Sequence, residues 1–207
     1  ISIEDKKFYQ HNGIDVKRIA GSLVANMRSN GISQGGSTIT QQLVKLVYLS
    51  NERSYVRKIR EAFISIGIEK KYSKDKILEY YINNIYFGNG YYGIQAAANG
   101  YFRKSVSSLS LSQVAFLCAI PNGPTEFDPY KNKDNTLKRR DLILKEMLSD
   151  GVITQDQYDE AIQEKIKVRK PKKSKINSVD SFVIECATKA LMKQQGFTFK
   201  YSFDSDA

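Results

Sequence analysis

Hydrophobic and polar residues alternate with a helical period through most of the chain. Apolar positions recur three and four residues apart, and this spacing is typical of helices that bury one face. The pattern predicts helices over residues 16–27, 39–49, 55–71, 74–84, 111–120, 135–148 and 155–164. An alternating, strand-like pattern occurs only near the C-terminal end, at 197–203, after a further helical stretch at 179–195. The expected fold class is therefore mainly α.

Side chains that cap helices mark where several of these helices begin. Three capping boxes pair a serine or threonine with a glutamine three residues later, and two more helices follow a single serine. These caps are Thr38 with Gln41, Ser110 with Gln113, Thr154 with Gln157, and the single residues Ser54 and Ser73. Pro121 and Gly151 are the predicted helix ends. Glycine- or proline-rich loops at 30–37, 87–93 and 121–130 interrupt the helices and are candidate functional loops.

A basic, proline-containing run over 165–175 marks the expected edge of the domain. We predict one domain over 1–168, followed at 169–207 by a basic linker and the start of a further domain. The first residue is Ile1 rather than methionine, and no stretch has the length of a membrane span. We interpret the chain as an excised fragment, so the missing span says little about the parent protein.

Charge narrows the possible partners. Lysine and arginine outnumber aspartate and glutamate by 32 to 22, which gives a formal net charge of +10. Such a surplus favours nucleic acid, an anionic membrane or a phosphorylated substrate. His11 is the only histidine, so a zinc site built from several histidines is excluded. Cys118 and Cys186 form no CxxC pair, and the apolar run around Cys118 predicts that this cysteine is buried.

Four segments carry candidate chemistry. The first, residues 4–13, holds adjacent carboxylates and the lone histidine, a pattern also typical of a solvated turn. The second, residues 35–45, is a glycine loop that enters a helix, and free N–H groups at a helix N-terminus suit a pyrophosphate or a sugar. It lacks the Gly-Lys-Ser/Thr of a P-loop, so nucleotide binding is not implied. An ordinary helix cap is an equal alternative.

The other two segments are a charged helix face and a tyrosine-rich run. Arg53, Arg57 and Glu61 are spaced by four, with Lys58 beside them. Arginine suits phosphate oxygens, although such a face is also typical of helix salt bridges. Residues 76–98 contain tyrosines that either stack on sugars or pack the core, and core packing is the simpler interpretation.

Together the four segments resemble the motifs of the peptidoglycan glycosyltransferases, the transglycosylase domains of class A penicillin-binding proteins and monofunctional transglycosylases. The motifs are Glu-Asp-x-x-Phe-x-x-His-x-Gly, Gly-Gly-Ser-Thr-Ile-Thr-Gln-Gln-x-x-Lys, Arg-Lys-x-x-Glu and Lys-x-x-x-Leu-Glu-x-Tyr-x-Asn, in this order, and 109–130 resembles a fifth block. The resemblance covers about 1–165. It implies a mainly helical, lysozyme-like fold with two lobes and a small lobe partly buried in the membrane.

The resemblance also implies residue roles. Glu4 corresponds to the catalytic general base and Glu61 to a second essential carboxylate, which is also a candidate ligand for a divalent metal ion, Mg or Mn, bound with the pyrophosphate. No organic cofactor is implied. The implied substrate-binding residues are Asp5, Phe8, His11, Ser37, Thr38, Gln41, Gln42, Lys45, Arg53, Arg57, Lys58 and Asn83. Two positions depart from the family: Leu46 replaces a common asparagine, and Gly21 replaces a common basic residue.

The implied reaction is polymerisation of lipid II onto a growing glycan chain, with inversion and release of undecaprenyl pyrophosphate. The resemblance also implies a setting at the extracytoplasmic face of the cell membrane, beside the cell-wall synthesis machinery, and a parent protein with an N-terminal membrane anchor. The apolar run 46–55 is a candidate membrane-dipping surface, with burial in the core as the alternative. A glycan hydrolase is disfavoured because a neutral glycan needs no basic cluster. Nucleic acid is not an expected partner, because the basic residues share helix faces with carboxylates.

Overall fold

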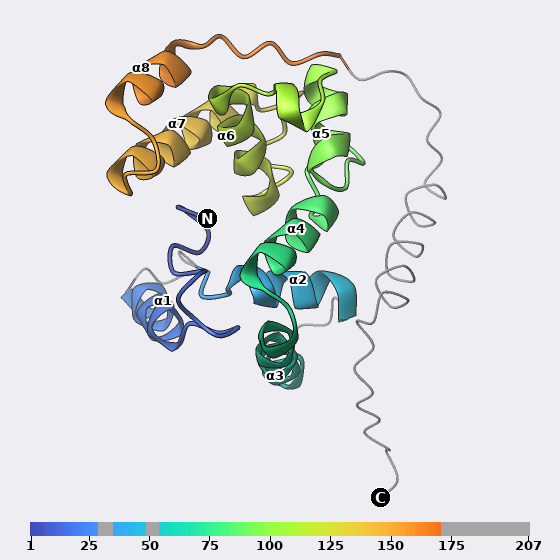
Figure 1. Ribbon diagram of the computed structural model, residues 1–207, viewed down its shortest axis with the longest axis vertical. Coiled ribbons are helices and arrows are strands. Elements are labelled where there is room, and N and C mark those ends of the chain that lie inside the picture. Colours follow the sequence, from blue (N-terminus) through green and yellow to red (C-terminus); the bar gives the residue numbers. More distant parts are fainter. Residues whose placement is uncertain (29–34, 49–53, 171–207) are drawn as a thin grey trace, which may run out of the picture. The chain divides into compact units, whose positions relative to one another are not determined.

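Eight α-helices form the part of the chain that the structure, a computed structural model, describes, namely residues 1–28, 35–48 and 54–170 (Figure 1). They are α1 (Val16–Arg28), α2 (Ile39–Tyr48), α3 (Tyr55–Lys71), α4 (Lys74–Asn84), α5 (Ile94–Phe102), α6 (Leu111–Ala119), α7 (Lys133–Ser149) and α8 (Gln155–Gln163). Two short 3-10 helices, η1 (Val106–Ser108) and η2 (Ile120–Asn122), flank α6. The mainly α fold class is confirmed, since these ranges contain no strand.

The predicted capping side chains begin the helices that they were expected to begin. Ser110 and Gln113 form a reciprocal capping box at α6, and Thr154 and Gln157 form another at α8. At α2, the Thr38 N–H donates to Gln41 Oε1, while the Gln41 N–H donates to Thr38 Oγ1. Local hydrogen bonds between neighbouring residues therefore set these helix starts, as the sequence predicts.

Helix α5 was not predicted, and its N-cap explains why. The cap is Gly93, which has a φ of 79° and offers no side-chain hydrogen bond. A Cβ at this position would lie 2.3 Å from the Asn83 carbonyl oxygen, so only glycine fits against the end of α4. The start of α5 is thus fixed by a tertiary contact rather than by a capping side chain.

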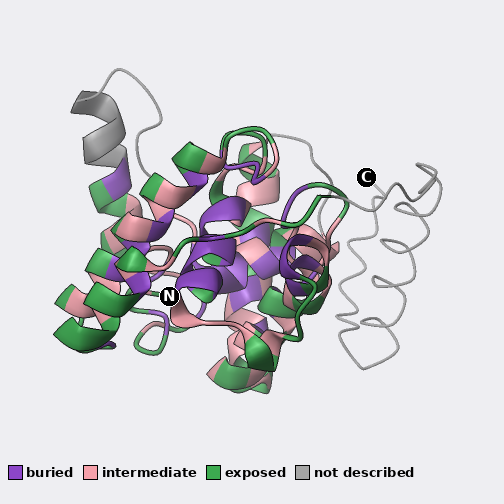
Figure 2. Ribbon diagram, turned by 90° about the horizontal axis from the view of Figure 1, so that it is seen from above, coloured by how far each residue is buried: buried purple, intermediate pink, exposed green. Residues whose placement is uncertain are grey.

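The helices pack in two groups that α4 and α5 connect. In one group α2 contacts both α3 and α4, and in the other α6 packs against α7 and α8. Contacts of α5 with α4 and with α6 join the groups. Buried residues gather on the inner faces and exposed residues on the outer faces (Figure 2). One apolar cluster of the described residues includes Phe87, Tyr101, Phe102, Phe116, Leu117 and Ile120.

The predicted division at residue 168 stays a prediction. The described residues belong to one compact unit, Ile1–Lys172. The helix expected at 179–195 and the strand expected at 197–203 lie outside the described residues. Within the described residues, no helix combines the length and the apolar character needed to cross a bilayer.

Candidate functional site

The N-terminal loop, residues 1–13, presents one carboxylate to a cleft while its neighbours anchor it. Phe8 is completely buried and Asp5 is 1% exposed. Asp5 Oδ2 accepts the Ile39 N–H of α2 at 2.9 Å. Lys6 Nζ forms ion pairs with Glu146 of α7 and with Asp150, the C-cap residue of that helix. Hydrogen bonding to Glu146 is the main cause of the raised pKa of Lys6. The loop is therefore tied to both helix groups.

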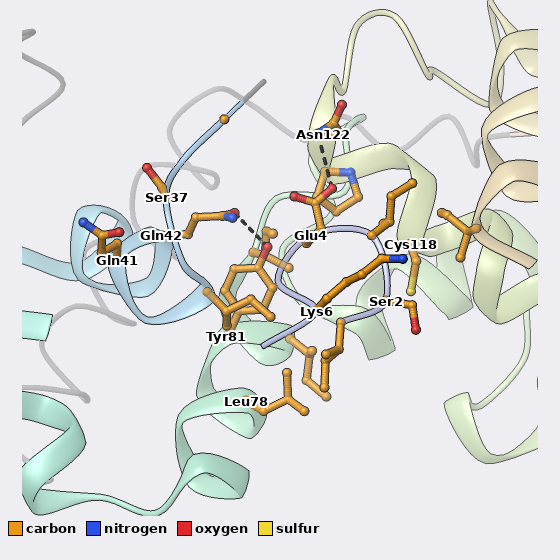
Figure 3. Close-up of a pocket in the computed structure, with 18 of the residues that line it drawn as sticks. Ser2, Glu4, Lys6, Ser37, Gln41, Gln42, Leu78, Tyr81, Cys118 and Asn122 are labelled. Atoms are coloured by element: carbon orange, nitrogen blue, oxygen red, sulfur yellow. Dashed lines mark hydrogen bonds between the residues drawn. The ribbon is translucent and has the colours of Figure 1, made fainter. Parts of the chain in front are cut away.

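Glu4 lies in the wall of this cleft with two partners from distant parts of the sequence. Asn122 Nδ2 donates to Glu4 Oε1 at 3.2 Å, and Arg139 Nη2 lies 3.5 Å from the same oxygen. Figure 3 shows the Glu4 carboxylate turned towards Asn122 while Lys6 points away from it. The Glu4 side chain remains 24% exposed, so a substrate hydroxyl can reach it.

The cleft has a volume of about 1400 Å³ and collects most of the predicted site residues. It brings together residues from all four sequence motifs, which lie tens of positions apart in the chain. The predicted residues in its wall are Glu4, Ser37, Gln41, Gln42, Lys45, Arg57, Lys58 and Glu61. The proposed base and the basic helix face therefore share one cleft.

Glu61 is the centre of the basic part of the site. Its side chain is 2% exposed and sits between two cations of its own helix. Arg57 Nη1 donates to Glu61 Oε2 at 2.9 Å, and Lys58 Nζ contacts Glu61 Oε1. Lys58 Nζ also donates to Ser37 Oγ at 2.7 Å, which links α3 to the glycine loop. Glu61 thus holds two cations in fixed positions at the cleft wall.

The surroundings of Glu61 do not suit a resident metal ion. Both carboxylate oxygens already accept from Arg57 or Lys58, and a metal would have to displace one of these cations. The residues that the structure describes contain no group of three acidic, histidine or cysteine side chains placed to hold a metal. The geometry favours Glu61 as an anchor for the two cations rather than as a metal ligand.

Several predicted substrate-binding residues lie elsewhere. Asp5, Phe8, His11 and Thr38 do not line the cleft but are buried beneath it, where they support the loop. Their role in substrate binding stays a prediction, because a sequence motif shows that residues belong together, but not which of them face solvent. Asn83 is exposed outside the cleft, with its backbone carbonyl against Gly93. Arg53 lies outside the described residues.

The cleft also contains residues that the sequence did not single out as site residues. Lys17 and Arg18 of α1 add positive charge, and Asn122 and Arg139 contact Glu4. Tyr81, read as core, donates its hydroxyl to Gln42 Oε1 at 2.9 Å (Figure 3). Burial, followed by nearby Glu4, raises the pKa of Tyr81, so the hydroxyl stays protonated and fixes the Gln42 amide. The position of Tyr81 in the tyrosine-rich segment was the sequence feature that could have indicated its place in the site.

Cys118 departs from the expectation of a buried cysteine. It is exposed and lines the cleft, although neighbouring protein atoms crowd its thiol and raise the pKa. The apolar run around it does face the core, since Phe116 and Leu117 are fully buried. Cys118 lies on a different face of α6 from these two residues, and the continuous apolar run in the sequence does not distinguish the buried face from the exposed one.

Comparison with known proteins identifies the family. The transglycosylase family matches residues 1–148 of this chain. Penicillin-binding protein 1A of Aquifex aeolicus (strain VF5) is 45% identical over 177 residues, 86% of this chain and 24% of that protein. Penicillin-binding protein 4 of Bacillus subtilis (strain 168) is 42% identical over 198 residues, 95% of this chain and 32% of that protein.

A third relative, penicillin-binding protein 1A of Streptococcus oralis, is 44% identical over 165 residues, 78% of this chain and 26% of that protein. The chain therefore belongs to the transglycosylase family, the peptidoglycan glycosyltransferases that its motifs indicate. It spans about a quarter to a third of the length of these relatives, whose matched shares are 24%, 32% and 26%.

Proposed function

We propose that this domain polymerises lipid II into glycan strands and releases undecaprenyl pyrophosphate. The observation that carries the proposal is that one cleft holds both an accessible carboxylate, Glu4, and a cation-rich wall of Lys45, Arg57 and Lys58. A glycosyl transfer from a pyrophosphate donor needs both, because one group must take a proton while the other stabilises a departing anion.

Glu4 is the proposed general base. The 4-hydroxyl of the acceptor sugar attacks the anomeric carbon of the growing chain, and the hydroxyl proton passes to the Glu4 carboxylate. Asn122 and Arg139 hold this carboxylate through one of its oxygens, Oε1. Attack on the face opposite the leaving group inverts the anomeric centre in one step, so no covalent sugar–enzyme intermediate is required.

The cationic wall is the proposed pyrophosphate site. Lys45 is exposed in the cleft, and the Glu61 carboxylate offsets only one of the two charges of Arg57 and Lys58. Lys17 and Arg18 add to the surplus. Charge that develops on the leaving group is therefore met by preorganised cations. A divalent ion that arrives with the pyrophosphate would supply further charge neutralisation, and Glu61 is not needed to hold it.

Two other functions would need a different site. A glycan hydrolase acts on a neutral polymer and gains nothing from the cationic wall. A nucleic-acid-binding protein would present its cations on an open face, whereas Arg57 and Lys58 are paired with buried Glu61 inside a cleft. These observations favour the pyrophosphate-linked donor.

The direct test is incubation of the domain with lipid II in detergent, followed by separation of the glycan products. We expect glycan polymers, with one undecaprenyl pyrophosphate released for each glycosidic bond formed. Solubilisation of finished cell-wall glycan without polymer formation would instead support a hydrolase. Tight, strongly salt-dependent binding of random DNA without polymer formation would support a nucleic-acid-binding role.

Replacing Lys45 by alanine is expected to weaken binding of a pyrophosphate-bearing donor by about tenfold or more, since a charge-assisted hydrogen bond contributes about 1.5–3 kcal/mol. Binding of a donor without the pyrophosphate should change little. Titration calorimetry with both ligands measures the difference. Lys145→Ala, on the exposed surface of α7 outside the cleft, is the matched control. Equal losses for both ligands would remove Lys45 from the pyrophosphate site.

We also propose that the domain works at the extracytoplasmic membrane surface, because the lipid tail of the substrate resists leaving the bilayer.

The membrane-dipping surface predicted at 46–55 needs revision in its bounds. Leu43 and Val44, which precede it, are buried, Leu46 and Val47 are partly buried, and 49–53 lie outside the described residues. The exposed apolar residues continue instead along α3. Tyr55, Val56, Ile59 and Phe63 are 92%, 58%, 58% and 73% exposed, and we call them the apolar face of α3.

Replacing Ile59 and Phe63 together by serine is expected to weaken binding to anionic liposomes by about tenfold or more, because each apolar side chain buried in lipid contributes about 1.5–3 kcal/mol. The melting temperature should stay nearly unchanged, since both side chains are already exposed. Liposome flotation and calorimetry measure the two effects. Val16→Ser, an equally exposed apolar position on α1, is the control. A lower melting temperature with unaltered flotation would place these residues in the core instead.

A further inference from the structure

A buried group of charged side chains lies beneath the loop that carries Glu4, and the proposed reaction does not use it. Asp5 and His11 come from the loop, Glu69 from α3 and Lys74 from the first turn of α4. The exposed fractions of these four side chains are 0%, 7%, 4% and 19%. Arg18 Nη1 lies 3.7 Å from Asp5 Oδ1. Two carboxylates and two permanent cations therefore balance around one histidine.

Hydrogen bonds define which nitrogen of His11 carries the proton. The Gly13 N–H donates to His11 Nδ1 at 3.2 Å, so Nδ1 has no proton and acts as an acceptor. His11 Nε2 then carries the proton and donates to Asp5 Oδ2 at 3.0 Å. Because Asp5 also accepts the Ile39 N–H, His11 is part of the connection between the loop and α2.

Contacts of Gly13 with neighbouring residues fix its position beside His11. Its φ is +93°, and a Cβ there would lie 2.7 Å from the Ser65 carbonyl carbon. Its own carbonyl accepts the Thr38 hydroxyl at 2.7 Å. The N–H that points at His11 Nδ1 is therefore fixed in place, and it needs an acceptor there.

Lys74 completes this network on the Nδ1 side of His11. Its Nζ lies 2.6 Å from Glu69 Oε2, 3.4 Å from His11 Nδ1 and 4.6 Å from the ring centre of Phe8. Glu69 Oε1 is itself 3.7 Å from His11 Nδ1 and accepts the Thr40 hydroxyl. Without the Lys74 charge, buried Glu69 would lose the cation with which it pairs. The contacts that fix the His11 ring would then have to rearrange.

We propose that Lys74 is a positioning residue for the catalytic loop, because its contacts with Glu69 and His11 hold the His11 ring, and so Asp5 and the adjacent Glu4, in place. This inference deepens the proposed function and rests on Glu4 as its base. Lys74 does not line the cleft, so it acts through His11 and not on the substrate.

The test uses Lys74→Met, which keeps an unbranched apolar chain against Phe8 but removes the charge. His11 is the only histidine, so nitrogen NMR of histidine-labelled protein reports the hydrogen bonding of its ring without assignment. We expect a proton on Nε2 and an accepting Nδ1 in the unchanged protein, and clearly shifted ring-nitrogen signals in the variant. Turnover of lipid II should fall by about 10- to 100-fold with little change in KM, as expected for a misplaced catalytic group.

Lys76→Met is the matched control, because Lys76 also lies in the first turn of α4, pairs with Glu79 at 3.0 Å and covers the Tyr80 ring at 4.9 Å. It should leave both readouts unchanged, and Lys74→Arg should restore both in part. Unchanged ring-nitrogen signals of His11 and normal turnover in Lys74→Met would overturn the proposal, as would a turnover loss that only matches a loss of folded protein. The NMR measurement needs no substrate, so it tests the role of Lys74 independently of the proposed function. The proposed function itself fails if the unchanged protein forms no polymer from lipid II.

Discussion

Replacing Glu4 by glutamine is expected to abolish glycan polymerisation while leaving the fold intact. Glutamine has nearly the same shape and can still meet Asn122, but its amide cannot take a proton from the acceptor hydroxyl. General-base help is typically worth about 10²–10⁴-fold, so turnover should fall by at least about 100-fold. The Glu4 side chain is 24% exposed, so the free energy of unfolding should change by less than about 0.5 kcal/mol.

The measurement is polymer formation from lipid II at saturating substrate, together with a thermal melt. Glu79→Gln is the matched control, since Glu79 is a solvent-exposed glutamate of α4 whose side chain is 54% exposed. Near-normal turnover in Glu4→Gln would show that another group accepts the proton. A large drop in melting temperature would mean that Glu4 serves the fold, through Asn122 and Arg139, more than the reaction.

Replacing Glu61 by glutamine is expected to reduce polymerisation by about 100-fold or more, for a different reason. Glu61 does not reach for a proton; it fixes Arg57 and Lys58, and small displacements of such groups cost about this much. The loss of charge-assisted hydrogen bonds should also lower the free energy of unfolding by about 1–3 kcal/mol. The 44% exposure of the Lys58 side chain keeps this cost moderate, because water can solvate the released ammonium group.

Donor affinity separates this role from metal binding. If Glu61 orients cations, Glu61→Gln should lose affinity for the pyrophosphate-bearing donor equally with and without a chelator. Glu61→Asp, which keeps the charge on a shorter side chain, should recover part of the activity. A defect that appears only when divalent metal is present would instead assign Glu61 to a metal, against the geometry of its two occupied oxygens.

The sequence by itself determined the helices whose starts depend on neighbouring residues. Ser54, Ser73, Ser110 and Thr154 accept backbone N–H groups three residues later, and those helices begin as predicted. The spacing of Arg57, Lys58 and Glu61 also fixed their mutual contacts, because residues three and four apart share a helix face. In both cases the interacting groups lie within one helical turn, so a short window of sequence contains the whole interaction.

Tertiary structure alone decided which members of a motif face the substrate. Glu4 and Asp5 are adjacent in sequence, yet Glu4 opens to the cleft and Asp5 is buried under it, because Ile39 and His11 hold Asp5 from below. The partners of Glu4, Asn122 and Arg139, lie more than a hundred residues away, and Gly93 starts α5 only because it fits against Asn83. Contacts over such separations depend on how helices pack, and no local pattern of residues encodes them.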